Sequence, residues 1–84
     1  MTTQLDYKRI EQWAQTKAAE NKSDIHLSNA FLRIARFGFD LRNMKNEELK
    51  TRRTDEYIAD IKDPDNQTPK SAIAYNMFFQ EFGL

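Results

Sequence analysis

The sequence predicts an all-α fold, a single domain of four helices, on three observations. Only two glycines and two prolines occur among the 84 residues, so few positions interrupt regular structure. Apolar residues recur at three- and four-residue spacing through most of the chain, and no segment alternates long enough for a half-buried strand. A chain of this length builds one small core, so we expect one domain over residues 1–84.

The first helix is expected over residues 4–20. Its apolar stripe includes Ile10 and Ala18, which lie two turns apart on one face. Either Thr3 or Asp6 can cap its start, because a hydroxyl or carboxylate oxygen accepts a hydrogen bond from a free backbone N–H of the first turn. The polar stretch after the helix marks its end.

The second helix is expected over residues 24–41, with Ser23 or Ser28 as its N-terminal cap. It is apolar on most sides, which is typical of the central helix of a small domain. Gly38 lies near its end, where the missing side chain either lets a neighbouring helix approach or helps end the helix. The apolar positions are Ile25, Leu27, Phe31, Leu32, Ile34, Ala35, Phe37, Phe39 and Leu41.

The third helix is expected over residues 47–62. Asn46 is a favourable N-cap, and Glu47 and Glu48 then occupy the first turn, where the helix dipole favours negative charge. The helix ends before Pro64, which begins a turn. Its apolar stripe is thin and consists of Leu49, Tyr57, Ile58 and Ile61.

The fourth helix is expected over residues 69–82. Thr68 can cap it, and Pro69 suits the first helical position because that residue needs no N–H donor. Gly83 follows the last apolar residue. The apolar positions are Ala72, Ile73, Met77, Phe78, Phe79 and Phe82, and we expect most of the aromatic residues of the chain to form the core.

Charge is balanced overall but unevenly distributed. Thirteen basic and thirteen acidic residues give a formal charge of zero. Residues 33–53 hold seven basic residues against three acidic ones, whereas residues 55–65 hold five acidic residues against Lys62 alone. Such a polarised molecule can orient an encounter with a polyanion or with a basic partner. Charge runs are more often solvated helix faces, here with pairs such as Arg52 and Glu56.

The sequence contains no recognisable catalytic or metal-binding set. There is no cysteine, and the single histidine, His26, has no partner for a zinc site or a nucleophile pair. We therefore expect a protein that is not an enzyme and has no cofactor, metal or small-molecule substrate. No segment reaches the roughly 20 apolar residues that span a bilayer, and no signal peptide is recognisable, so we expect no membrane and a cytoplasmic location.

Three segments resemble the N-terminal core-binding domain of tyrosine recombinases, the SAM-like helical domain of phage-type integrases. They are WAQTKAAENKSDI, NEELKTRRTDEYIADIKD and TPKSAIAYNMFFQEFG, which together cover most of the chain. The third helix of that family commonly carries a Leu, Thr, Arg and Tyr-Ile pattern, to which Leu49, Thr51, Arg53 and Tyr57 with Ile58 correspond. Thr68 with Pro69 matches the usual start of its last helix, and Phe78, Phe79 and Phe82 match the aromatic cluster at its end.

The resemblance implies a module that forms one side of a clamp around duplex DNA. Basic side chains would neutralise phosphates, which makes such binding strongly salt-dependent. At the start of the last helix the family often carries Thr-Ile-Asn-Arg, whereas this chain has Ser-Ala-Ile-Ala over residues 71–74. The expected nucleic-acid contacts are Lys17, Lys22, Arg33, Arg36, Lys50, Arg52, Arg53, Lys70 and Ser71.

The alternative is a small protein-binding regulator, such as a phage- or mobile-element-encoded inhibitor that attaches to a larger host protein. The second helix has more apolar positions than one small core requires, so some of its aromatic residues would form an exposed binding patch. The acidic segment that follows would add charge to that patch. The expected contacts are Phe37, Phe39, Asp55, Glu56, Asp60 and Asp63.

Overall fold

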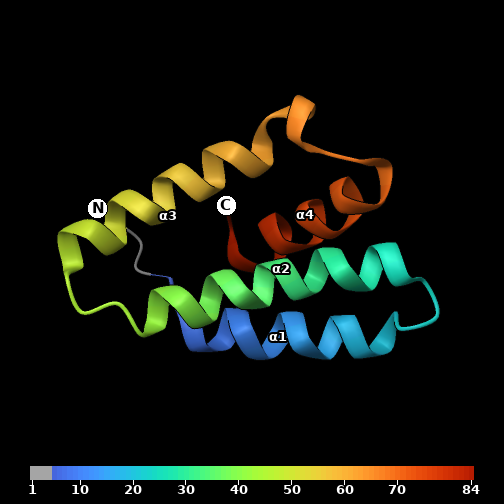
Figure 1. Cartoon of the computed structure of the whole chain (residues 1–84), viewed down its shortest axis with the longest axis horizontal. Coiled ribbons are helices and arrows are strands. Elements are labelled where there is room, and N and C mark those ends of the chain that lie inside the picture. The colour runs from blue at the N-terminus through green and yellow to red at the C-terminus, as the bar shows by residue number, and fades with distance from the viewer. Residues whose placement is uncertain (1–4) are drawn as a thin grey trace.

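The computed structural model describes residues 5–84 and confirms the all-α, four-helix class. Helices α1 and α2 are antiparallel neighbours, α3 returns along the other side of α2, and α4 packs against α2 (Figure 1). No helix in this part of the chain is long and apolar enough to cross a membrane. The elements are α1 (Tyr7–Glu20), α2 (Ile25–Arg42), α3 (Glu47–Lys62), the short 3₁₀ helix η1 (Pro64–Asn66) and α4 (Pro69–Phe82).

The core confirms α2 as the central helix. It supplies seven buried residues, more than any other helix in residues 5–84, and packs against both α1 and α4. The largest fully buried side chains are Ile10, Phe31, Ile34 and Phe78. Each contributes roughly 1.5–3 kcal/mol by leaving water. The Trp13 ring closes one edge of this core, 5.7 Å from the Phe31 ring in an edge-on geometry.

The first helix begins three residues later than predicted, and Asp6 is its cap. The Asp6 carboxylate accepts a hydrogen bond of 3.0 Å from the backbone N–H of Arg9. The alternative cap, Thr3, lies outside the described residues.

The predicted cap of the second helix is wrong. Asp24, rather than Ser23 or Ser28, accepts the hydrogen bond from the backbone N–H of Leu27, at 3.3 Å. The Ser28 hydroxyl donates instead to the backbone carbonyl of Ala18 at 2.9 Å, so it ties α2 to α1. A carboxylate is a better acceptor than a hydroxyl for the partial positive charge at a helix start, which explains the choice.

The caps of the last two helices agree with the prediction. Asn46 accepts a hydrogen bond from the backbone N–H of Leu49 at 3.0 Å. Thr68 and Ser71 form a reciprocal capping box, in which each side chain accepts from the backbone N–H of the other residue. Gly83 ends α4 in the left-handed conformation, with φ of 68°.

Gly38 brings α1 and α2 together. A Cβ atom at this position would lie 2.7 Å from the backbone carbonyl oxygen of Tyr7 and 2.8 Å from the backbone nitrogen of Glu11. Of the two roles predicted for this glycine, close helix approach is therefore correct, and α2 continues to Arg42. The two helices touch backbone to backbone because no side chain separates them.

Candidate functional site

Helix α3 is the least tightly packed of the four helices. Only Thr54 and Ile61 of α3 are buried, because its apolar stripe is thin. The Thr54 hydroxyl donates to the backbone carbonyl of Lys50 at 2.8 Å. The Tyr7 hydroxyl lies 2.7 Å from the Thr54 hydroxyl oxygen. Because the hydroxyl hydrogen of Thr54 is used in the bond to the Lys50 carbonyl, Tyr7 is the donor in the second bond, which connects α3 to the start of α1.

An open groove of about 540 Å³ runs between α2 and α3. Its apolar lining consists of Phe37, Leu41, Met44 and Tyr57. The rings of Phe37 and Tyr57 stack face to face, with centroids 4.1 Å apart and planes 9° from parallel. The volume lies within the range of pockets that bind ligands, roughly 300–1,000 Å³.

The expectation of an exposed Phe37 is wrong in this structure. Its ring is only 5% exposed, because Tyr57 covers it from α3. Phe39 is on the surface, so it is the aromatic residue of α2 that a partner can reach in this structure.

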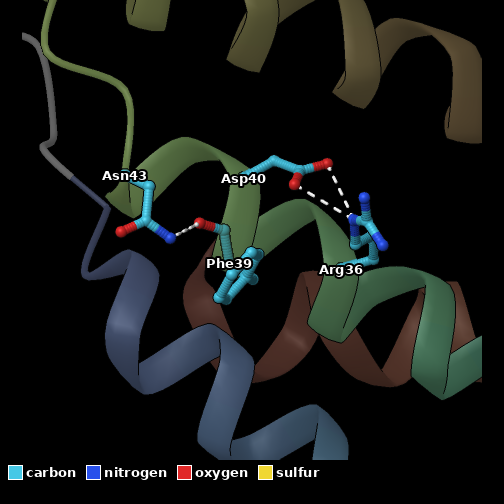
Figure 2. A network of polar contacts seen from close by, with 4 residues as sticks. All are labelled: Arg36, Phe39, Asp40 and Asn43. Carbon is cyan, nitrogen blue, oxygen red and sulfur yellow. Dashed lines mark hydrogen bonds and ion pairs between the residues drawn. The ribbon is translucent and has the colours of Figure 1, made fainter.

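Six charged residues, three of each sign, line the groove above this apolar floor. Arg36 bonds to Asp40 one turn further along α2 at 3.0 Å (Figure 2), and Arg53 bonds to Glu56 along α3 at 3.5 Å. All four side chains are largely exposed, so each pair contributes at most about 1 kcal/mol. The lining residues are Arg33, Arg36 and Asp40 on α2, and Arg53, Glu56 and Asp60 on α3.

The charges on the two walls oppose one another in sign. The stack of Phe37 on Tyr57 fixes which residues of the antiparallel helices lie level with one another. Arg33, four residues before Phe37, is therefore level with Asp60, three residues after Tyr57. Within residues 5–84 no ion pair joins the two walls. The groove is thus bordered by opposite charges that do not close it.

The Tyr57 hydroxyl is buried without a hydrogen-bond partner in the described part of the chain. Burial raises the pKa of Tyr57 well above its ordinary value, while the positive charge of Arg33 acts weakly in the opposite direction. The phenol therefore remains protonated at physiological pH. A buried hydroxyl without a partner costs about 1–3 kcal/mol.

Helix α2 also carries an apolar stripe on its solvent face, which we call the α2 stripe. Ile25, Leu32 and Phe39 are 65%, 48% and 42% exposed and follow one another at seven-residue spacing. Such spacing keeps three side chains on one face of a helix. The Arg42 guanidinium lies 5.2 Å from the centre of the Phe39 ring and covers one end of the stripe. The stripe borders the groove, because Arg36 lies one turn after Leu32.

The predicted nucleic-acid contacts do not gather on one surface. Lys17 pairs with Glu20 at 3.8 Å, and Lys70 pairs with the Asp24 cap at 2.6 Å, so these lysines lie near the α1–α2 connection, as does Lys22. The Lys50 ammonium lies over the Tyr7 ring near the start of α3. Arg33, Arg36 and Arg53 line the groove instead, and Lys70 is not among its lining residues.

Two further details of the charge prediction change. Ser71 is 4% exposed and its hydroxyl is held in the capping box of α4, so it is not accessible to a ligand in this structure, contrary to the prediction of a surface contact. Glu56 pairs with Arg53 rather than with Arg52, because residues three apart also face each other on a helix. Arg52 is exposed and is not among the groove-lining residues.

The four acidic residues of the alternative prediction divide between two places. Glu56 and Asp60 line the groove. Asp55 is exposed outside the groove lining, and Asp63 caps η1 by accepting a hydrogen bond of 3.0 Å from the backbone N–H of Asp65. Sequence reasoning missed Asp40, Leu41, Met44 and Tyr57 as site residues. Helical periodicity assigns Asp40 to a solvent face and Leu41 and Tyr57 to the core, and Met44 lies in the connection between α2 and α3.

Residues 5–84 hold no group of three or more His, Cys, Asp or Glu side chains that could bind a metal ion. No protein-family model, curated protein or solved structure matches the chain. The groove and the α2 stripe are the surface features that point to a function.

Proposed function

We propose that this protein is a non-catalytic protein-binding module that holds a helix of a larger protein in the groove between α2 and α3. The observation that carries the proposal is the open groove itself, with an apolar floor below opposite charges. A groove of this kind receives the apolar face of an amphipathic helix. The proposal keeps the alternative of the sequence analysis, a small regulator or inhibitor of the phage or mobile-element type that acts on a larger host protein complex.

The arrangement of charge supports a protein partner over duplex DNA. A surface that binds the phosphate backbone presents positive charge along its length. Here Arg36 pairs with Asp40 and Arg53 with Glu56, and Asp60 adds a third negative charge to the same groove. The lysines near the α1–α2 connection are partly neutralised as well, by Glu20 and Asp24.

The α2 stripe extends the proposed binding surface. Ile25 and Phe39 are fourteen residues apart, which corresponds to about 21 Å along a helix. A partner seated in the groove can therefore cover the stripe with a second element. Exposed apolar side chains in a row beside a groove are characteristic of interaction surfaces.

Duplex DNA remains the second candidate ligand, on one specific observation. Lys22, Arg33 and Arg52 are exposed and have no ion-pair partner within residues 5–84. A core-binding role would use these side chains against phosphates, and the resemblance to recombinase core-binding domains supports it. An amide-shift NMR titration with a short duplex at two salt concentrations tests this candidate directly.

The protein-binding proposal is tested with two matched surface variants. Met44→Lys places a charge on the groove floor, whereas Ile73→Glu places one on the exposed face of α4, outside the groove. Circular dichroism first establishes that both variants are folded. We expect one protein of the host cell to bind both the wild type and Ile73→Glu but not Met44→Lys. The same protein, once purified, should again bind the wild type.

The opposite result would overturn the proposal. If no partner depends on Met44, and the duplex shifts the amides of Arg33, Arg52 and Lys22 in a way that fades with salt, the protein is a DNA-binding module. If the duplex causes no shifts at low salt, the second candidate is excluded.

A further inference from the structure

The order of charges along the groove is specific and limits which helix can occupy it. From the end of the groove that lies away from the α2–α3 connection toward its middle, α2 presents Arg33 and then Arg36, and α3 presents Asp60 and then Glu56. Next to the connection the signs are exchanged, since α2 presents Asp40. An occupant therefore meets a positive wall on one side and a negative wall on the other.

At the end of the groove next to the α2–α3 connection, α3 presents the positive charge of Arg53 opposite the negative charge of Asp40 on α2. Arg53 lies four positions before Tyr57, and Asp40 lies three positions after Phe37, so the stacked rings place them at one level. Seven residues separate Arg33 from Asp40, which corresponds to about 10 Å of helix. The pattern thus spans about two turns of a helix.

These side chains are free to turn toward an occupant. The existing pairs, Arg36 with Asp40 and Arg53 with Glu56, run along each helix and are exposed to water. Arg33 and Asp60 make no ion pair within residues 5–84. Exposed pairs of this kind are weak and are readily replaced by contacts with a ligand.

We infer that the occupant is an amphipathic helix whose two flanks carry opposite charges: acidic residues toward Arg33 and Arg36, and basic residues toward Glu56 and Asp60. In the turn of the occupant that lies between Asp40 and Arg53 the charges are exchanged, so a basic residue faces Asp40 and an acidic residue faces Arg53. This inference rests on the proposed function and adds the partner's sequence pattern to it.

The size of the groove agrees with such an occupant. A helix with its side chains is about 10–12 Å wide, which is too large for a space of about 540 Å³ to enclose over two turns. The backbone of the occupant therefore lies above the groove, and its apolar ridge of a few large side chains enters to contact Met44 and Tyr57, which are partly exposed. Charged flanks beside this ridge lie level with the groove's charged residues.

Two designed helical peptides of identical composition test the inference. The matched peptide carries an apolar ridge with the flank charges given above, and the exchanged peptide carries the same ridge with every flank charge reversed. Binding is measured by fluorescence anisotropy and mapped by NMR amide shifts. We expect the matched peptide to bind at least about tenfold more tightly, because the exchanged peptide places like charges together.

A pair of protein variants makes the test specific to the groove. Arg33→Glu combined with Asp60→Arg reverses two opposing charges and should remove most of the preference between the peptides. Arg52→Glu combined with Asp55→Arg is the matched control on the exposed part of α3, outside the groove lining, and should leave the preference unchanged.

The outcomes separate this inference from the proposed function. Equal binding of the two peptides, or a preference that the control variant removes as well, overturns the charge pattern. If neither peptide binds, but a host protein still binds the wild type and not Met44→Lys, the inferred charge pattern of the occupant is wrong while the groove remains a protein-binding site. If neither peptide binds and no partner depends on Met44, both proposals fail.

Discussion

Replacing Gly38 with alanine tests the central packing of the molecule. From helix propensity alone, alanine in the middle of a helix should stabilise it by roughly 0.5–1 kcal/mol relative to glycine. The structure predicts the opposite sign. The new methyl group would meet the carbonyl oxygen of Tyr7 at 2.7 Å and the backbone nitrogen of Glu11 at 2.8 Å, both fixed backbone atoms.

The expected magnitude follows from these distances. Favourable contacts between heavy atoms lie near 3.5–4.0 Å, so α1 and α2 must separate by roughly 1 Å at this level. Overpacking of this kind costs about 1–3 kcal/mol, and separation of the helices also weakens neighbouring core contacts. After subtraction of the propensity gain, we expect Gly38→Ala to lower the free energy of unfolding by about 1–2 kcal/mol. For a domain of this size, this corresponds to a decrease in Tm of roughly 4–16 °C.

Thermal and urea unfolding followed by circular dichroism measures this change. Asn29→Ala is the matched control, because Asn29 is an exposed residue of the same helix and should show only a small propensity gain. If Gly38→Ala is as stable as the wild type or more stable, the close approach of α1 and α2 is wrong.

Two further predictions concern single side chains. Tyr57→Phe retains the ring stack on Phe37 and removes a buried hydroxyl without a partner. The free energy of unfolding in urea should therefore stay the same or rise, by at most about 3 kcal/mol. A clear decrease would show that the hydroxyl is hydrogen-bonded. The hydrogen bond from Lys70, followed by that from the Leu27 amide, holds the pKa of Asp24 below its ordinary value of 3.8. Because the folded pKa is the lower one, this stabilisation is present above the unfolded pKa and is lost as pH falls through the folded value. Asp24→Asn retains a good cap without the charge, so its Tm should fall less than that of the wild type below about pH 4. Parallel pH profiles of the two proteins would contradict this assignment.

Tertiary contacts changed several local predictions in a consistent way. Two serines that were predicted in one hydrogen-bonding or contact role have another role in the structure. Ser28 could have capped its own helix, but Asp24 was better placed, and the Ser28 hydroxyl bonded to the carbonyl of Ala18 in α1. Ser71 was expected on a binding face, yet its hydroxyl completes a capping box with Thr68. For Ser28, sequence spacing within α2 does not rank the alternatives, because Ala18 belongs to another helix. Thr68 lies only three residues before Ser71, so that capping box is a local feature that the analysis of the sequence missed.

The sequence by itself determined the four helices, the Asn46 and Thr68 caps, the central place of α2 and the balance of charge, since periodicity and capping act over only a few residues. The groove was decided by tertiary structure. Its existence depends on how far α3 stands from α2, and its charge order depends on the level at which Tyr57 stacks on Phe37. Both are contacts between helices, and helical periodicity within one segment carries no information about the register of another.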